Sequence, residues 1–205
     1  MTTWICKGPV TALALFTLAG CEAGQGFGLG SRSGQGGAQS PLSRANMVNG
    51  VTLVAPSGFC IDRTSLEPRF AVMARCDGLG VTAAAGAAPR GLITVSLTDA
   101  KSGSVPSAEQ VAQASQLENV DAVEQAENQV VFRAQGRIPV GGLSPTQWRG
   151  VRKISGQTAG IAVYGPAQGE IVTRTGRDLL VQLIERSVEA TPQRAAADTT
   201  TPARN

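Results

Sequence analysis

The chain has 205 residues, of which 42% are hydrophobic and 16% charged, enough for one packed domain with appended segments. The net charge is +3 and the basic side chains are spread along the chain, which argues against nucleic-acid binding, because that function calls for clustered Lys and Arg with stacking aromatic residues. No histidine is present, which excludes histidine metal sites, Ser-His-Asp triads and imidazole pH switches.

The first twenty residues have the features of an export signal. Lys7 supplies a positive charge, and the stretch from Val10 to Gly20 is uncharged and mostly apolar. This stretch is shorter than the about 20 apolar residues that a membrane-spanning helix needs, and it has the length of a secretory signal core. We therefore expect residues 1–20 to be a signal peptide that is removed from the mature protein.

The four residues Leu18-Ala19-Gly20-Cys21 resemble the lipobox of bacterial lipoproteins. The resemblance implies cleavage before Cys21, attachment of diacylglycerol and palmitate there, and stable membrane anchoring, which takes more than one acyl chain. In that family an Asp after the cysteine retains the protein at the inner membrane. Glu22 stands there in this chain, which implies the outer membrane, facing the periplasm. The alternatives are an ordinary cleaved signal followed by a chance cysteine, and an uncleaved anchor, for which no basic flank follows.

Both ends of the mature chain have compositions that do not support a packed core. Residues 22–50 are rich in Gly, Ser and Gln, and we expect residues 21–50 to be a lipidated tether spanning roughly 30 Å. The glycine spacing matches neither a dinucleotide-binding nor a phosphate-binding loop. Residues 190–205 are expected to form a disordered tail, which leaves residues 51–189 as the folded domain.

Alternating apolar residues predict six strands, and the last two are expected to form a hairpin around Ser155-Gly156-Gln157. The predicted strands lie at residues 51–56, 69–76, 91–98, 129–136, 146–156 and 158–166. A capping box of Ser107 and Gln110 predicts a helix between the third and fourth strands. Its apolar positions are Val111, Ala114 and Leu117.

A second, stronger helix is predicted at residues 175–190, capped by Thr175 or a neighbour, with Asp178 in its first turn. Its apolar face consists of Leu179, Leu180, Leu183, Ile184 and Val188. We therefore expect an α+β fold, with a single antiparallel sheet, two helices packed on one face and one disulfide. The order of these elements, with paired strands leading into a C-terminal helix, resembles PsbP-like domains.

Cys60 and Cys76 are the expected disulfide partners. Cys6 would be removed with the signal peptide and Cys21 would carry the lipid, which leaves these two thiols in a protein expected to reach an oxidising compartment. Such a loop closure would stabilise the domain by about 3 kcal/mol. The alternative, a redox-active pair, usually has Cys-x-x-Cys spacing, which is absent here. Four charged residues flank the cysteines and are expected to form a solvated salt-bridge cluster, the alternative being general acid–base chemistry. They are Asp62, Arg63, Arg75 and Asp77.

The charges in the middle of the chain are segregated. All five between residues 102 and 127 are acidic, and all five between residues 128 and 153 are basic. One interpretation is complementary neighbouring surfaces on one domain. The other is an arginine-bearing sheet edge that binds an anionic envelope component, such as lipid head groups, polysaccharide or an acidic protein. Arg149, Arg152 and Trp148 are the candidate partner-binding residues, although Trp148 could instead be the largest core residue.

No serine-acylation, metal-binding or nucleotide-binding motif is present, so we predict no catalytic residues, no metal site and no cofactor. The sequence therefore favours a non-enzymatic envelope lipoprotein that acts as a binding or scaffolding module, held to the membrane through Cys21. The alternatives are a periplasmic small-ligand binder with a pocket between helix and sheet, and a carboxylate-based hydrolase of envelope material, which would need a buried pair of acids in a cleft.

Overall fold

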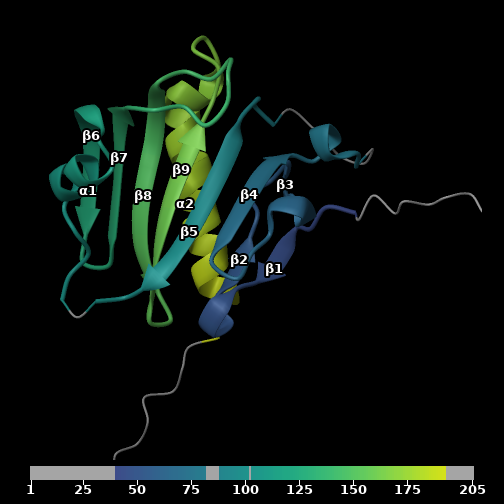
Figure 1. Ribbon diagram of the computed structural model, residues 1–205, viewed down its shortest axis with the longest axis horizontal. Helices are drawn as coiled ribbons and strands as arrows, with labels where there is room; N and C mark the ends of the chain where they lie inside the picture. The colour runs from purple at the N-terminus through teal and green to yellow at the C-terminus, as the bar shows by residue number, and fades with distance from the viewer. Residues whose placement is uncertain (1–39, 82–87, 102, 193–205) are drawn as a thin grey trace, which may run out of the picture. The chain divides into compact units, whose positions relative to one another are not determined.

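The structure, a computed structural model, describes residues 40–81, 88–101 and 103–192, which form an α+β fold (Figure 1). The predicted signal peptide, Cys21, the tether as far as residue 39 and the tail from residue 193 lie outside the described residues. The strands and helices, in chain order, are β1 (Arg44–Asn46), β2 (Thr52–Val54), β3 (Phe59–Ile61), β4 (Phe70–Arg75), β5 (Leu92–Asp99), α1 (Ala108–Ala114), β6 (Glu118–Ala126), β7 (Gln129–Gln135), β8 (Thr146–Ile154), β9 (Gln157–Tyr164) and α2 (Arg174–Ala190).

Among these residues, seven strands form one antiparallel sheet in the order β3-β4-β5-β9-β8-β7-β6, and β1 pairs with β2 separately. The predicted α+β class, antiparallel sheet and disulfide are confirmed. The predicted hairpin is also present, because Ile154 of β8 pairs with Gln157 of β9. Ser155 and Gly156 join these strands with φ angles of 48° and 76°, the positive values that a tight two-residue hairpin turn needs.

Helix α2 covers one face of the sheet and runs behind β8, β9 and β5 in Figure 1. Leu180, Leu183 and Ile184 are buried in one cluster with the inward side chains of β5 and β9, such as Val95 and Val163. Leu179 and Val188 pack against the same cluster, so the predicted apolar face of this helix is confirmed. The β1–β2 pair contributes to the same cluster and thus lies on the same face of the sheet.

Helix α1 packs on the opposite face, which corrects the expectation that both helices share one face. Val131 of β7 belongs to the cluster with α2, whereas its neighbours Val130 and Phe132 cluster with Ala108 and Ala112 of α1. Successive side chains of a strand point to opposite faces, so the two helices sandwich this end of the sheet. The buried sheet residues of the α1 cluster come from β7 and β8, and Val120 of β6 packs against them, whereas β4, β5 and β9 contribute nothing to this cluster.

The helix ends agree in part with the sequence-based expectations. The capping box is confirmed, since Ser107 Oγ accepts from the Gln110 N–H at 3.3 Å and Gln110 Oε1 accepts from the Ser107 N–H at 2.9 Å. Ala114 is exposed, so the predicted α1 face is wrong at that position. Thr173 caps α2, and no acidic residue lies in its first turn, so the placement of Asp178 there is corrected.

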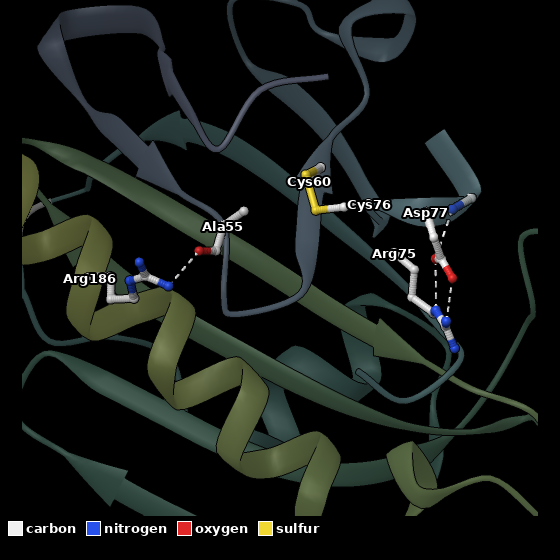
Figure 2. The surroundings of a disulfide bond; sticks show 7 residues. Ala55, Cys60, Arg75, Cys76, Asp77 and Arg186 are labelled. Carbon is white, nitrogen blue, oxygen red and sulfur yellow. Dashed lines mark hydrogen bonds and ion pairs between the residues drawn. A yellow bond between two sulfur atoms is a disulfide. The ribbon is translucent and has the colours of Figure 1, made fainter. Parts of the chain in front are cut away.

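The packed structure extends beyond residues 51–189. Ala45 and Met47 are buried, although the sequence placed both in the tether, and Thr191 is buried just after α2. Arg186 of α2 donates to the Ala55 carbonyl at 2.9 Å, which joins the C-terminal helix to the segment after β2 (Figure 2). Neither of the two helices in the described part of the chain is long and apolar enough to cross a membrane.

Candidate functional site

The two predicted disulfide partners meet at one edge of the sheet (Figure 2). Cys60 lies in β3 and Cys76 follows β4, and the antiparallel pairing of these strands brings their sulfur atoms to 2.02 Å. The disulfide therefore ties the outermost strand, β3, to the rest of the sheet.

The four charges that flank these cysteines do not form one cluster. Asp62 Oδ1 accepts from the Thr64 N–H at 3.0 Å and caps a short turn, while Arg63 donates to the Ser40 carbonyl at 2.6 Å. Arg75 and Asp77 form an ion pair with each other. Hydrogen bonding from Arg75 lowers the pKa of Asp77, which disfavours the protonated form that a general acid needs.

Trp148 is a core residue rather than part of a surface. It is 5% exposed, and its indole Nε1–H donates to the Thr173 carbonyl at 2.7 Å, just before α2. Gly176 of α2 lies over the ring, so closely that a β-carbon there would come within 2.7 Å of Trp148 Cδ1. The Arg133 guanidinium lies 6.0 Å from the ring centroid. Of the two interpretations of Trp148, the structure therefore favours the core residue.

Arg149 and Arg152 lie on opposite faces of the sheet, because an interval of three residues along a strand reverses the face. Arg152 is on the α2 side with Trp148, and Arg149 is on the α1 side. The three candidate partner-binding residues thus do not form one surface. Arg152 lines a pocket of about 620 Å³ together with Gln129, Ile184, Glu185, Val188 and Glu189.

The segregated charges meet partly as complementary neighbours. Arg133 of β7 pairs with Asp121 of the adjacent strand β6, with N···O distances of 2.8 and 2.7 Å. Glu124 of β6 pairs instead with Arg177 of α2, at 2.9 and 2.6 Å. Hydrogen bonds from these arginines lower the pKa of both acids. The complementary-surface interpretation therefore describes the Arg133–Asp121 pair. It describes neither Arg177, which lies outside the basic stretch of residues 128–153, nor Arg149.

A groove between α1 and the sheet contains Arg149 and is the candidate functional site. It has a volume of about 140 Å³, and its polar side chains are Arg149 of β8, Thr94 and Ser96 of β5, and Ser115 after α1. The Nε of Arg149 is buried and has no hydrogen-bond partner among the described residues. Its guanidinium carbon lies 5.6 Å from the centroid of the Tyr164 ring. Burial lowers the pKa of Arg149 below its ordinary value.

Sequence reasoning selected Arg149 and raised a pocket between helix and sheet as an alternative, but it did not place Arg149 in that pocket and missed the hydroxyl groups that line it. The available signal was the alternation in β5, which leaves Thr94, Ser96 and Thr98 on the face away from the α2 cluster. In the described residues, no group of three or more Cys, Asp or Glu residues is arranged to hold a metal ion. The arrangement at the groove is suited to binding an anion, because its one charged group is cationic and partly removed from solvent.

No family model matches the chain, and no curated protein matches its sequence. Three solved structures resemble it weakly, at low identity. The Ran-binding protein Mog1p of Saccharomyces cerevisiae matches with a TM-score of 0.46 and 13% identity over 73% of this chain and 97% of that one. A mutant of protein Mog1 gives 0.45 and 14% over 72% and 93%. Cyanobacterial PsbP from Synechocystis gives 0.36 and 15% over 81% and 99%. PsbP is thus among the structures that the chain weakly resembles, and at these scores none of them bears on function.

Proposed function

We propose that the chain is an exported lipoprotein of the bacterial cell envelope, anchored through Cys21, whose domain acts as a non-enzymatic binding module. The observation that carries the proposal is the Cys60–Cys76 disulfide in a domain that follows a lipobox-like segment. Disulfides persist in oxidising compartments such as the periplasm, so the bond supports export. The proposed location is the outer membrane, facing the periplasm, because Glu22 rather than Asp follows Cys21.

Binding is a better-supported role than catalysis. A carboxylate-based hydrolase needs an acid whose pKa is raised by burial. The pKa values of Asp77, Asp99, Asp121 and Glu124 are instead lowered, in each case through hydrogen bonds to neighbouring side chains that include an arginine. These acids therefore serve the fold as ionised partners.

Between the two binding roles, the groove at Arg149 favours a small ligand over a flat scaffold surface. The sequence-based expectation of an arginine patch required Arg149 and Arg152 to share a face, and they do not. The groove is instead lined by hydroxyl groups and contains the Nε of Arg149, which has no hydrogen-bond partner among the described residues. Small-ligand sites are typically concave and carry a few polar groups of this kind. We therefore propose that the binding partner is an anionic small molecule of the envelope and not the surface of a macromolecule.

The experiment that tests anchoring compares Cys21→Ser with Cys6→Ser in a Gram-negative bacterium grown with labelled palmitate. We expect label in the wild-type protein and in Cys6→Ser, because residue 6 is removed with the signal. Cys21→Ser should carry no label and should leave the membrane fraction. Label on Cys21→Ser, or a wild-type protein without label, would overturn the anchoring proposal.

A further inference from the structure

We infer that the groove between α1 and the sheet binds a small monocarboxylate, whose carboxylate group is held by the guanidinium of Arg149. This inference names the ligand class for the binding function proposed above, and it rests on that function but not on lipid attachment at Cys21.

The position of Arg149 in the sheet leaves its charge without a neighbour of opposite sign. Strand register places Phe132 on one side of it and Ala162 on the other, followed by Thr94 and Val72 further across the sheet. None of these four side chains is acidic. The groove lining likewise contains no carboxylate.

Four other arginines differ from Arg149 in having an acidic partner. Their ion pairs are Arg69–Asp99, Arg75–Asp77, Arg133–Asp121 and Arg177–Glu124. Arg149 is half-buried and makes no such pair within the described residues. Removing a charge from water without a counter-ion is unfavourable, and a bound anion would restore the missing interaction.

Arg152 is the nearest rival, because its Nε is also buried and without a hydrogen-bond partner in the part of the chain that is described. Arg152 lines two pockets, however, and one of them also contains the carboxylates of Glu185 and Glu189. These acids supply negative charge next to Arg152 and would repel an anionic ligand. The groove of Arg149 has no such competitor.

The chemistry and size of the groove point to a carboxylate with a short apolar body. The planar guanidinium matches a carboxylate through two parallel N–H···O bonds. One cation balances a single negative charge, whereas a phosphate dianion would be left undercompensated. Val111, Val151 and Ala162 line the groove beside the hydroxyl groups. The volume of about 140 Å³ equals that of about four or five water molecules, which suits a ligand of a few carbon atoms.

Tyr164 acts as a positioning residue for this site. Its buried ring lies against the guanidinium of Arg149, 5.6 Å from centroid to guanidinium carbon. Stacking on an aromatic face leaves the N–H groups at the edge of the guanidinium plane free to donate. The arginine is therefore restricted in its motion before a ligand arrives, which reduces the entropic cost of binding.

The experiment is isothermal titration calorimetry on the purified full-length protein in detergent, with acetate, propionate and butyrate as probes. Butyramide, which has the same shape as butyrate without its charge, and inorganic phosphate are the comparison ligands. We expect saturable binding of at least one of the three carboxylates, at least tenfold tighter than butyramide or phosphate.

Three variants identify the residues involved. Arg149→Met keeps the apolar stem and removes the charge, and it should weaken carboxylate binding at least tenfold without lowering the melting temperature, because a partly buried charge is lost. Arg152→Met, on the same strand but the opposite face, should bind as the wild type does. Gly160→Ala places a methyl group in the groove, 3.1 Å from Ser96 Oγ, and should weaken binding while the protein stays folded.

No saturable binding of any of the three carboxylates, equal binding of butyramide or phosphate, or unchanged affinity in Arg149→Met would overturn the inference. An equal loss of affinity in Arg152→Met would do the same. Palmitate labelling at Cys21 is measured separately, so failure of the carboxylate site and failure of the anchoring proposal are distinguishable.

Discussion

Thr52 and Thr191, 139 residues apart in the chain, are joined by a buried hydrogen bond in which the backbone N–H of Thr52 donates to Thr191 Oγ1 at 3.0 Å. The next outward-facing amide of β2, that of Val54, donates to Ser187 Oγ at 3.0 Å. Side-chain hydroxyls at the C-terminal end of α2 therefore take the place of a neighbouring strand along this edge of β2. The arrangement ties the start of the folded domain to its end.

Removing the Thr191 hydroxyl should therefore destabilise the domain. Thr191→Val keeps the shape of the side chain but leaves the buried amide of Thr52 without an acceptor, at a cost of about 1–3 kcal/mol. Thr191→Ser keeps the acceptor and should cost less than the valine variant. Urea unfolding measures both free energies, and equal values for the two variants would contradict the role given to the hydroxyl.

Gly176 should not tolerate a side chain, because there is no room for a β-carbon between α2, Ile171 and Trp148. A β-carbon at this position would collide with the Ile171 carbonyl oxygen and lie 2.7 Å from Trp148 Cδ1. Helix propensity alone favours alanine over glycine by about 1 kcal/mol. We expect Gly176→Ala to destabilise the domain instead, by about 2–3 kcal/mol, as overpacking does.

Gly141→Ala is the matched control for that substitution, because a β-carbon there meets nothing within 4 Å. Its unfolding free energy should stay near that of the wild type. Thermal or urea unfolding of the two variants compares them directly. A Gly176→Ala protein as stable as Gly141→Ala would show that α2 does not pack on Trp148 as described.

The burial of Trp148 predicts its fluorescence. The chain has two tryptophans, Trp4 and Trp148, and a Trp4→Phe variant leaves Trp148 as the sole tryptophan whether or not the predicted signal peptide is removed. We expect weak quenching by iodide in the folded protein and strong quenching after urea unfolding, because the ring is 5% exposed. Strong quenching before unfolding would place Trp148 on a surface, where it could contribute to partner binding.

The ion pair between Glu124 and Arg177 predicts a pH dependence of stability. The pKa of Glu124 is lowered in the fold, mainly by its hydrogen bonds to Arg177. A lowered pKa stabilises the fold above the unfolded value of about 4.3, and this stabilisation is lost as the pH falls through the folded value. Both side chains are partly exposed, so the contribution at neutral pH is expected to be about 0.5 kcal/mol.

Glu124→Gln should therefore be less stable than the wild type at pH 7 and should approach it as the pH falls below 4.3. Glu118→Gln is the control on the same strand, since Glu118 forms no ion pair among the described residues. Urea unfolding at pH 7 and in this acidic range gives both differences. A difference between Glu124→Gln and wild type that does not change with pH would contradict the ion-pair explanation.

Much of the fold was predictable from local patterns. Strand β5 alternates in burial along most of its length and β9 does so over its first residues, α2 has an apolar face, and the capping box of α1 is a short-range signal. β6 was not predictable in this way, because it is exposed along most of its length and its pairing shifts register between Glu118 and Glu124. The positive φ angles of Asn119 and Ala122 lie in this irregular stretch.

The placement of α1 and the groove depends on long-range register, which a local pattern does not contain. Alternation shows that Val130 and Val131 face opposite sides, but not which side each helix covers. Likewise, Thr94 reaches the neighbourhood of Arg149 only because β9 is inserted between β5 and β8, with Ala162 opposite both residues. The cysteine pair was predicted by assigning Cys6 to a signal peptide and Cys21 to a lipid anchor, which left Cys60 and Cys76 as the one pair.

We propose that the chain is an exported protein held to a membrane by a lipid on Cys21. Mass spectrometry of the N-terminal peptide, from protein extracted from envelopes of a bacterial host, tests it most directly. We predict a peptide that begins at Cys21 and carries the mass of diacylglycerol and a further acyl chain. A peptide with an unmodified Cys21, whether the leader is retained or removed at another position, would contradict the claim.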